Sequence, residues 1–525
     1  MNFTQPPSVS FAQKRFLIFL VVLSLIATLL GGIATSRYGA GVASDSVKYM
    51  AVAQSLLAGN GLFDHRGLPL LSWPPLYSII LAGLSLVSGL DVFVAGWWFN
   101  VFLLGLNLFL SGVIFWRIFQ TKPLYAYLAS GFVCLSISSL RIHATIFSEP
   151  LYLTMTLGLL IVIDGYIRQH SRRAFIWMVA LSALAPMLRY VGLAVTVTGL
   201  IVILIENRKE PRIFLRDGFI LGGVSIIPIG WWLVIRNIMT YGTLFGTGDA
   251  EVDVYQNTSL ALTKILHWFV PYLTPLMPIL TRPFILLFVM ALLLWFLNRK
   301  RSDLMRAWAQ ALMDRSVYPT LIYGVVYFVA VVLTIITGDH QWLDTDDRYY
   351  VILLVPVALL VVFTYDILIQ PHLPAFRRSN LIVVVLFVLW SVYPLYGMRE
   401  YLATARTIGE PSGYNHFNGR AFHESNIVIE MQKLRIAQPD AFFYGNYVDA
   451  VWFYTRKPVQ TLPTKTVSDF TVVYAGWPHD KPGYIVWFKP NEYKHYLSPD
   501  ELSQFSELEL MYSDPSGDIY YVRPR

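Results

Sequence analysis

The chain has 525 residues, of which 55% are hydrophobic and only 14% are charged, and its formal net charge is +7. Soluble domains carry roughly 25% charged residues, so this composition excludes an ordinary cytosolic enzyme, a disordered chain and a nucleic-acid-binding protein of the basic-patch type. The single cysteine, Cys134, excludes an internal disulfide and any metal site built from several cysteines.

Long apolar runs dominate the first 398 residues, and most approach the roughly 20 residues that a helix needs to cross a bilayer. The first run follows Lys14 and Arg15 and is too long for the core of a signal peptide, so we expect it to remain as a span. Eleven spans are predicted, near residues 16–36, 93–116, 124–140, 150–167, 174–188, 191–205, 218–236, 284–298, 317–337, 349–369 and 379–397.

The basic residues between the spans predict their orientation, because cytoplasmic loops are enriched in Lys and Arg. The basic clusters share one side only if the apolar segment 75–90, which begins at Pro75, does not cross the membrane. That short segment is typical of an interfacial or re-entrant helix. The pattern therefore predicts a cytoplasmic N-terminus and an extracytoplasmic tail. The long loops expected on the outer face are 37–92, 141–149, 238–283 and 338–348.

The tail, residues 399–525, is predicted to form a separate soluble domain outside the membrane domain of residues 1–398. Its 13 Lys and Arg residues nearly balance its 15 Asp and Glu residues, unlike the basic remainder of the chain. Alternating helix and strand patterns indicate a small α/β domain. The expected helices are 422–437, 447–455 and 498–505, and the expected strands are 441–446, 458–462, 484–488, 507–512 and 518–522.

The first outer loop carries the most informative candidate, Asp45, at the start of a helix-like segment that continues to Leu57. A carboxylate at this position can cap the helix, or it can accept a proton from an incoming hydroxyl group, and one residue can do both. Lys48 and Tyr49 on the same segment are candidates for binding an anionic group or for anchoring the helix at the interface.

The second outer loop ends in Ser148-Glu149-Pro150, a pattern typical of a helix N-terminus. Alternatively, Glu149 positions an acceptor, a metal or Asp45. His143 in the same loop is predicted to be solvated rather than catalytic, although it is a candidate for contact with an acceptor. The remaining candidates for contact with an acceptor are His65 and Trp73 of the first outer loop.

Two arginines, Arg189 and Arg348, stand at predicted outer ends of spans, against the usual charge bias. Such residues either snorkel to lipid headgroups or bind an anionic ligand, and the guanidinium group is well suited to phosphate. The acidic loop 338–348 has no recognised metal-ligand spacing. The sequence therefore specifies no cofactor for certain, and it leaves a divalent metal open.

The order of several segments resembles the GT-C glycosyltransferases of the family 39 type, which include protein O-mannosyltransferases and lipid A aminoarabinose transferases. The similar segments are DSVKYMAVAQSLLAGNG from Asp45, WPPLYSIILAGL from Trp73, SEPLYL from Ser148, LRYVGL from Leu188 and DRYYVILLVPVALL from Asp347. The sequence departs from the pattern at Trp73, where many relatives have His, and at Glu149, where several have Asp.

This resemblance implies a GT-C-like membrane fold and transfer of a sugar from a polyprenyl-phosphate donor to a hydroxyl group, with inversion. Membrane lipids surround such a protein, and the acceptor is a glycan, a lipid or a protein at the outer face of the cell membrane. The resemblance assigns proton abstraction to Asp45 and a secondary carboxylate role to Glu149. It assigns the donor phosphate to Arg348 and Arg189, with Lys48 and Tyr49 beside them.

The competing interpretation is a polytopic transporter or flippase for a lipid-linked or small anionic substrate. Such proteins show paired broken helices, a two-fold repeat and ionisable residues in mid-span. In this sequence the charges gather at the outer ends of the spans, and no two-fold repeat is visible. A non-catalytic membrane scaffold is a further alternative, which predicts that Asp45 is dispensable.

Overall fold

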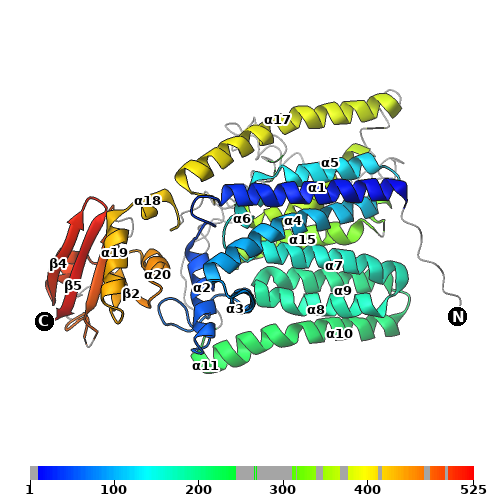
Figure 1. The fold of residues 1–525 in the computed structure, drawn as a ribbon. Coiled ribbons are helices and arrows are strands. Elements are labelled where there is room, and N and C mark those ends of the chain that lie inside the picture. Colours follow the sequence, from blue (N-terminus) through cyan, green and yellow to red (C-terminus); the bar gives the residue numbers. More distant parts are fainter. Residues whose placement is uncertain are drawn as a thin grey trace.

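The computed structural model describes residues 10–243, 265, 268, 310–314, 316–337, 347–366, 370, 376–411, 417–465, 473–479, 481–490 and 495–525. The predicted span 284–298 and most of the acidic loop 338–348 lie outside the described residues. Figure 1 shows a bundle of long, roughly parallel helices with a small sheet domain at one end.

The bundle consists of the apolar segments that the sequence predicts as spans. Its long helices are α1 (Phe11–Ala34), α4 (Val92–Ile118), α7 (Glu149–Gln169), α8 (Arg172–Leu188), α9 (Leu193–Glu206), α10 (Pro211–Gly230), α15 (Tyr318–Thr337), α16 (Leu354–Thr364) and α17 (Phe376–Ile408). A π-helical segment, η2 (Trp231–Ile238), and α11 (Met239–Tyr241) extend α10. Large apolar side chains point outward, and Phe219 on α10 is 82% exposed, as expected for a surface covered by lipid.

Ten of the predicted spans coincide with helices of the described residues. Within the described part of the chain, five helices are long and apolar enough by themselves to cross a membrane, and a bent pair makes a sixth. The total of eleven spans stays a prediction. The bent pair is α5 (Pro123–Cys134) and α6 (Ile137–His143), which meet at an angle of 55°.

The run 124–140, which the sequence predicts as one span, consists of two helices with a bend between them. The first helix ends at Cys134 with Leu135 as its C-cap, and Ser136 caps the second helix, because its hydroxyl group accepts a hydrogen bond of 3.2 Å from the backbone N–H of Ser139.

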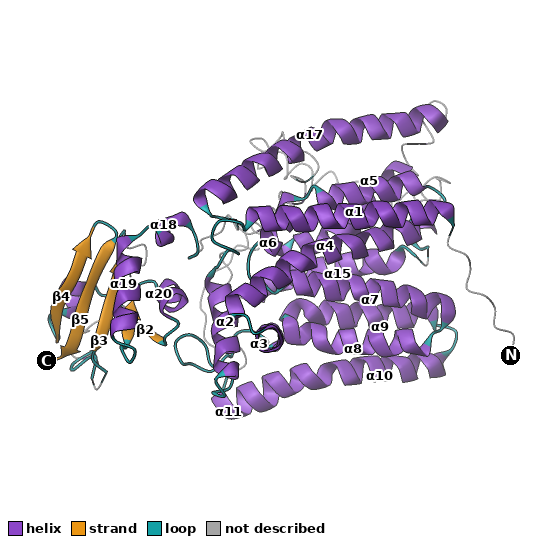
Figure 2. Cartoon of the chain, in the orientation of Figure 1, coloured by secondary structure: helices purple, strands orange, loops and turns teal. Residues whose placement is uncertain are grey.

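Two short helices, α2 (Ser44–Leu57) and α3 (Leu76–Ser88), run across the end of the bundle (Figure 2). The 13 residues of α3 span about 20 Å, which is less than the roughly 30 Å of a bilayer's hydrocarbon core. This arrangement agrees with the prediction that the segment 75–90 does not cross the membrane.

The C-terminal residues form the expected α/β domain. Its five strands are β1 (Phe443–Gly445), β2 (Val459–Thr461), β3 (Gly483–Phe488), β4 (Ser506–Asp514) and β5 (Gly517–Pro524), in the sheet order β2-β1-β3-β5-β4. The first three strands are parallel, and β5 is antiparallel to both β3 and β4. The helices of this domain are α18 (Arg420–His423), α19 (Asn426–Ala437), α20 (Val448–Thr455) and α22 (Pro499–Leu502). Figure 1 places α19 and α20 between the sheet and the bundle.

The C-terminal domain is docked on the bundle end that carries α2 and α3 (Figure 1). The loop after α1 holds it through backbone contacts. The N–H of Phe417 donates to the carbonyl of Val42 at 2.7 Å, and the Asn418 side chain donates to the carbonyls of Tyr38 and Ala40. The start of α1 lies at the opposite end of the bundle.

Candidate active site

Four charged residues from distant parts of the sequence meet at the bundle end crossed by α2. Asp45 lies in the first turn of α2, and Glu149 is the first residue of α7. Arg189 directly follows α8, and Arg348 lies in a short 3-10 segment, η4 (Asp347–Tyr349). We call these four residues the acid–arginine network.

The network alternates acidic and basic groups at close range. Nη1 of Arg348 lies 2.9 Å from Oδ2 of Asp45, and its Nε lies 3.6 Å from Oε1 of Glu149. The same Glu149 oxygen lies 2.6 Å from Nη1 of Arg189. Glu149 thus joins both guanidinium groups, whereas Asp45 contacts Arg348 at one edge. Two positive and two negative charges compensate one another, which partial burial requires.

Polar and aromatic side chains fix the orientation of both arginines. Nη1 of Arg189 donates to Oγ of Ser148 at 3.0 Å, and the Tyr49 hydroxyl lies 3.2 Å from the same oxygen. Nη2 of Arg348 donates to the Tyr349 hydroxyl at 2.6 Å. The guanidinium carbon of Arg348 also lies 4.7 Å from the ring centroid of Phe147, a cation–π distance.

The backbone that precedes Glu149 is held in an extended conformation beside the backbone that precedes Asp45. The side-chain amide of Asn100 donates to the carbonyls of Thr145 and Phe147 at 2.7 and 3.0 Å. Gly41 pairs with Thr145 in an isolated parallel bridge. These contacts bring the two carboxylates to one place although 104 positions separate them in the sequence.

The charges around Asp45 determine its protonation state. Burial by itself raises the pKa of this carboxyl group, but the neighbouring charges of Arg348, Lys48 and Arg189 outweigh burial and hold the pKa below its usual value. Asp45 is therefore ionised at neutral pH, and it is a weak base while Arg348 contacts it. Burial raises the pKa of Tyr49, so that its hydroxyl group keeps its proton.

The structure places the other predicted site residues outside this network. Nζ of Lys48 lies 3.8 Å from the ring centroid of Trp73, on the side of α2 that faces the C-terminal domain. His65 is buried against Asp449 of that domain. Asp449 was not among the residues predicted from the sequence, because nothing local in the tail distinguishes it from a solvated acidic residue.

His143 corrects the expectation of a solvated side chain. Helix α6 extends to His143, so the residue lies inside the bundle end rather than in a loop, and its side chain is fully buried. Its Nδ1 lies 2.7 Å from the carbonyl of Ser139, and its Nε2 lies 2.9 Å from the side-chain nitrogen of Asn107. These contacts give His143 a structural role within the bundle.

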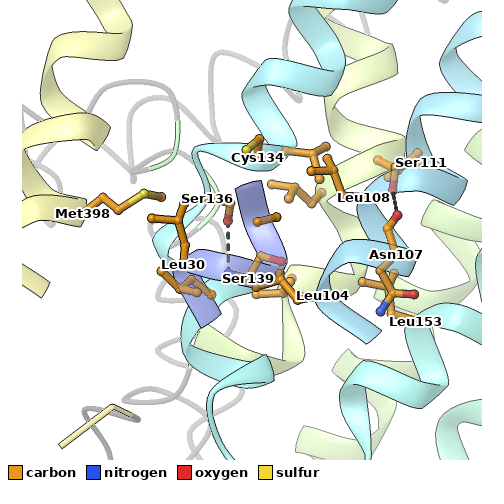
Figure 3. A pocket seen from close by; sticks show the side chains of 16 residues that line it. Leu30, Leu104, Asn107, Leu108, Ser111, Cys134, Ser136, Ser139, Leu153 and Met398 are labelled. Atoms are coloured by element: carbon orange, nitrogen blue, oxygen red, sulfur yellow. Dashed lines mark hydrogen bonds between the residues drawn. The ribbon is translucent and has the colours of Figure 1, made fainter. Parts of the chain in front are cut away.

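A cavity lies inside the bundle (Figure 3). The cavity is small, and its walls are mostly apolar, with Asn107 and Ser111 among the polar side chains that line it. Leu153, one turn after Glu149, and Val351, three residues after Arg348, also line it. An apolar space thus lies about one helical turn from the charged groups.

The described residues contain no group of three or more His, Cys, Asp and Glu side chains that could hold a metal ion. Both acidic members of the network already contact arginines. An anion can replace a carboxylate on a guanidinium group, so the arrangement is suited to an anionic ligand. The acidic side chains of the loop 338–346 lie outside the described residues.

No protein-family model and no curated protein matches the sequence. Among solved structures, ArnT from Cupriavidus metallidurans in the apo state matches with a TM-score of 0.57 and 15% identity, over 96% of this chain and 97% of that chain. The same protein bound to undecaprenyl phosphate matches with a TM-score of 0.54 and 15% identity, over 96% and 98% of the two chains. The arabinofuranosyltransferase AftD from Mycobacteria has 12% identity and a TM-score of 0.49, over 97% of this chain and 40% of that chain.

The likeness to ArnT extends over nearly the full length of both proteins, from the helical bundle to the C-terminal sheet. It confirms the fold class that the sequence resemblance predicts. The chain has the fold of ArnT, a polytopic GT-C fold with a C-terminal α/β domain.

Proposed function

We propose that this chain is a membrane glycosyltransferase that moves a sugar from a polyprenyl-phosphate donor to a hydroxyl group of an acceptor. The observation that carries the proposal is the acid–arginine network at the end of an apolar bundle. A donor of this kind needs cationic groups for its phosphate and apolar surroundings for its chain. The bound undecaprenyl phosphate of ArnT, which has the same fold, supports this class of ligand.

In this proposal, the donor phosphate binds Arg348 and Arg189 through pairs of charge-assisted hydrogen bonds. Phosphate oxygens then replace the Asp45 carboxylate at Nη1 of Arg348, which now lies 2.9 Å from it. Because Arg348 is the strongest of the charges that lower the pKa of Asp45, its engagement by phosphate raises that pKa. Donor binding thus turns a weak base into a stronger one at the moment it is needed.

The freed Asp45 carboxylate accepts the proton of the acceptor hydroxyl. The acceptor oxygen forms a bond to the anomeric carbon while the bond from that carbon to the phosphate oxygen breaks. The bonding electrons go to the phosphate, which leaves as polyprenyl phosphate against the two arginines. Attack opposite the leaving group inverts the anomeric configuration. Glu149 stays between the arginines and keeps them oriented.

The proposed location is the cell membrane, with the N-terminus in the cytoplasm and the residues from 399 onward forming a domain outside it. The basic loops support this orientation, because Lys and Arg accumulate on the cytoplasmic side. The network then faces the extracytoplasmic side, where a glycan, a lipid or a protein serves as acceptor.

The test measures the transfer of sugar from radiolabelled polyprenyl-phosphate donors by the purified full-length protein in lipid. The wild type is compared with Asp45→Asn. We expect wild-type transfer and a loss of about 10²-fold or more in the variant, the usual contribution of a general base. Asp440→Asn, which changes an exposed acidic residue of the C-terminal domain, is the matched control. Undiminished transfer by Asp45→Asn would remove the proposed role of Asp45.

A further inference from the structure

The segment between α2 and α3 folds into a short hairpin, residues 62–70, that points at the C-terminal domain. The N–H of Leu70 donates to the carbonyl of Leu62 at 2.9 Å, and Phe63 and Pro69 form an antiparallel bridge. The Asp64 carboxylate accepts hydrogen bonds from the N–H groups of Arg66 and Leu68 and so closes the tip. We call this segment the juxtamembrane hairpin.

The tip of the hairpin is held by the C-terminal domain through both backbone and side chain. The carbonyl of His65 accepts a hydrogen bond of 3.0 Å from the N–H of Val459 on β2. Nε2 of His65 lies 3.2 Å from Oδ1 of Asp449, in the first turn of α20. The side chains of His65 and Asp449 are only 2% and 15% exposed. Neither Nε2 of His65 nor Oδ1 of Asp449 makes a hydrogen bond within the described residues, so the contact between them is electrostatic.

Trp73 follows the hairpin by three residues. Nζ of Lys48 lies 3.8 Å from the centroid of the Trp73 ring. Lys48 lies three residues after Asp45 on α2, so the two side chains are neighbours on the helix surface. The ammonium group interacts electrostatically with Asp45 on one side and with Asp449 on the other. The C-terminal domain thus contacts the hairpin directly, and electrostatic interactions of Lys48 connect that domain to Asp45 of the acid–arginine network.

We propose that Asp449 is a positioning residue for sugar transfer, which holds the juxtamembrane hairpin through His65 and holds Lys48 beside Asp45. The inference rests on the proposed function. It assigns the C-terminal domain a part in the reaction itself, because the orientation of the base then depends on a carboxylate supplied by that domain.

Lys48 gives the proposal a measurable pH signature. Burial lowers the pKa of Lys48, the charges of Asp45, Asp449 and Asp64 raise it, and Arg66 lowers it further. Removal of the Asp449 charge leaves the ammonium group easier to deprotonate. The cation that helps to orient the Asp45 carboxylate is then lost at a lower pH than in the wild type, so the alkaline limb of the pH profile moves to lower pH.

The experiment compares Asp449→Asn with Asp440→Asn, a change at an exposed position of the same domain. We expect Asp449→Asn to lower kcat about tenfold with little change in the donor KM, since misplacement of a reacting group weakens the chemical step. The alkaline limb should move to lower pH, and Asp449→Glu should restore part of the rate. Equal kcat and pH profiles for the two Asn variants would overturn the inference. A loss that is the same at every pH and is not rescued by Glu would also overturn it, because a merely structural role predicts that result.

Hydrogen exchange separates this inference from the proposed function. If the wild-type protein transfers no polyprenyl-linked sugar, the proposed function is wrong, and this result does not decide the role of Asp449. Exchange measured on the full-length protein still tests whether Asp449 positions residues 44–57 and 62–70. We expect faster exchange in both segments for Asp449→Asn than for Asp440→Asn. Equal exchange rates would overturn the positioning role whatever the activity.

Discussion

Asp45 and Glu149 belong to one network, yet their surroundings give them different chemical capacities. The Glu149 side chain is 2% exposed and contacts both guanidinium groups, whereas the Asp45 side chain is 21% exposed and contacts one. An acceptor arriving from water can reach Asp45 far more easily than Glu149. At the residue scale, Asp45 is therefore suited to proton transfer and Glu149 to holding the arginines in place.

Replacement of Arg348 by alanine should raise the donor KM about tenfold or more, because a charge-assisted pair of hydrogen bonds to phosphate is lost. The same change removes the strongest charge that lowers the pKa of Asp45, so that pKa rises. Asp45 must be ionised to accept a proton, and the acid limb of the pH profile should move to higher pH. Donor titrations and pH profiles check both effects. Arg216→Ala, at an exposed arginine, is the control. An unchanged donor titration for Arg348→Ala would remove Arg348 from the proposed phosphate site.

The change Glu149→Gln should destabilise the protein more than Asp45→Asn does. It leaves two guanidinium groups without the carboxylate that joins them, and breaking a buried ion pair costs about 3–5 kcal/mol. The change Asp45→Asn should lower the free energy of unfolding by less, because the Asp45 side chain is more exposed. Thermal unfolding in matched lipid or detergent measures the difference. Equal stability of the two variants would refute the structural role of Glu149.

At the scale of elements, the network depends on where helices α2 and α7 begin. Helices α2 and α7 begin next to each other because the backbone preceding Glu149 pairs with that preceding Asp45. The sequence predicted both helix starts and the short helix α3. It could not predict the break in the apolar run 124–140, because hydropathy reflects composition, whereas the second helix begins at an N-cap hydrogen bond to the Ser136 hydroxyl group.

The segment η4 that carries Arg348 is held by α15, which suggests a test at the element scale. The hydroxyl of Tyr327 donates to the carbonyl of Tyr349 at 2.8 Å. Tyr327→Phe leaves that carbonyl without this donor, which costs about 1–3 kcal/mol for a buried group. We expect a donor KM several-fold higher as Arg348 loses its fixed position. Tyr323→Phe, on the same helix but bonded to Tyr152 and Thr156, should change KM much less. Identical KM values for the two variants would contradict the role given to Tyr327.

At the scale of the whole molecule, the sequence predicted the bundle, the α/β character of the tail and the convergence of Asp45, Glu149, Arg189 and Arg348 at one end. The length of an apolar run, an alternating helix and strand pattern, and an arginine at the outer end of a span can all be recognised in a sequence without knowledge of the fold. The contact of His65 with Asp449 could not be predicted, because it joins two domains across 384 positions and neither residue carries a local signal.

The predicted orientation can be tested with single cysteines in a Cys134→Ala background. A cysteine at Asp440 in the C-terminal domain should react with a membrane-impermeant maleimide in intact cells. A cysteine at Lys209, in a basic loop at the other end of the bundle, should react only after the membrane is opened. The reverse pattern would invert the proposed topology and place the network on the cytoplasmic side.

The most direct measurement is a structure of the full-length protein in lipid with polyprenyl phosphate bound. The account predicts phosphate density between Arg189 and Arg348, a hydrocarbon chain leading into the apolar bundle, and an Asp45 carboxylate that has separated from Nη1 of Arg348. Phosphate bound elsewhere, with the 2.9 Å contact between Asp45 and Arg348 intact, would contradict it.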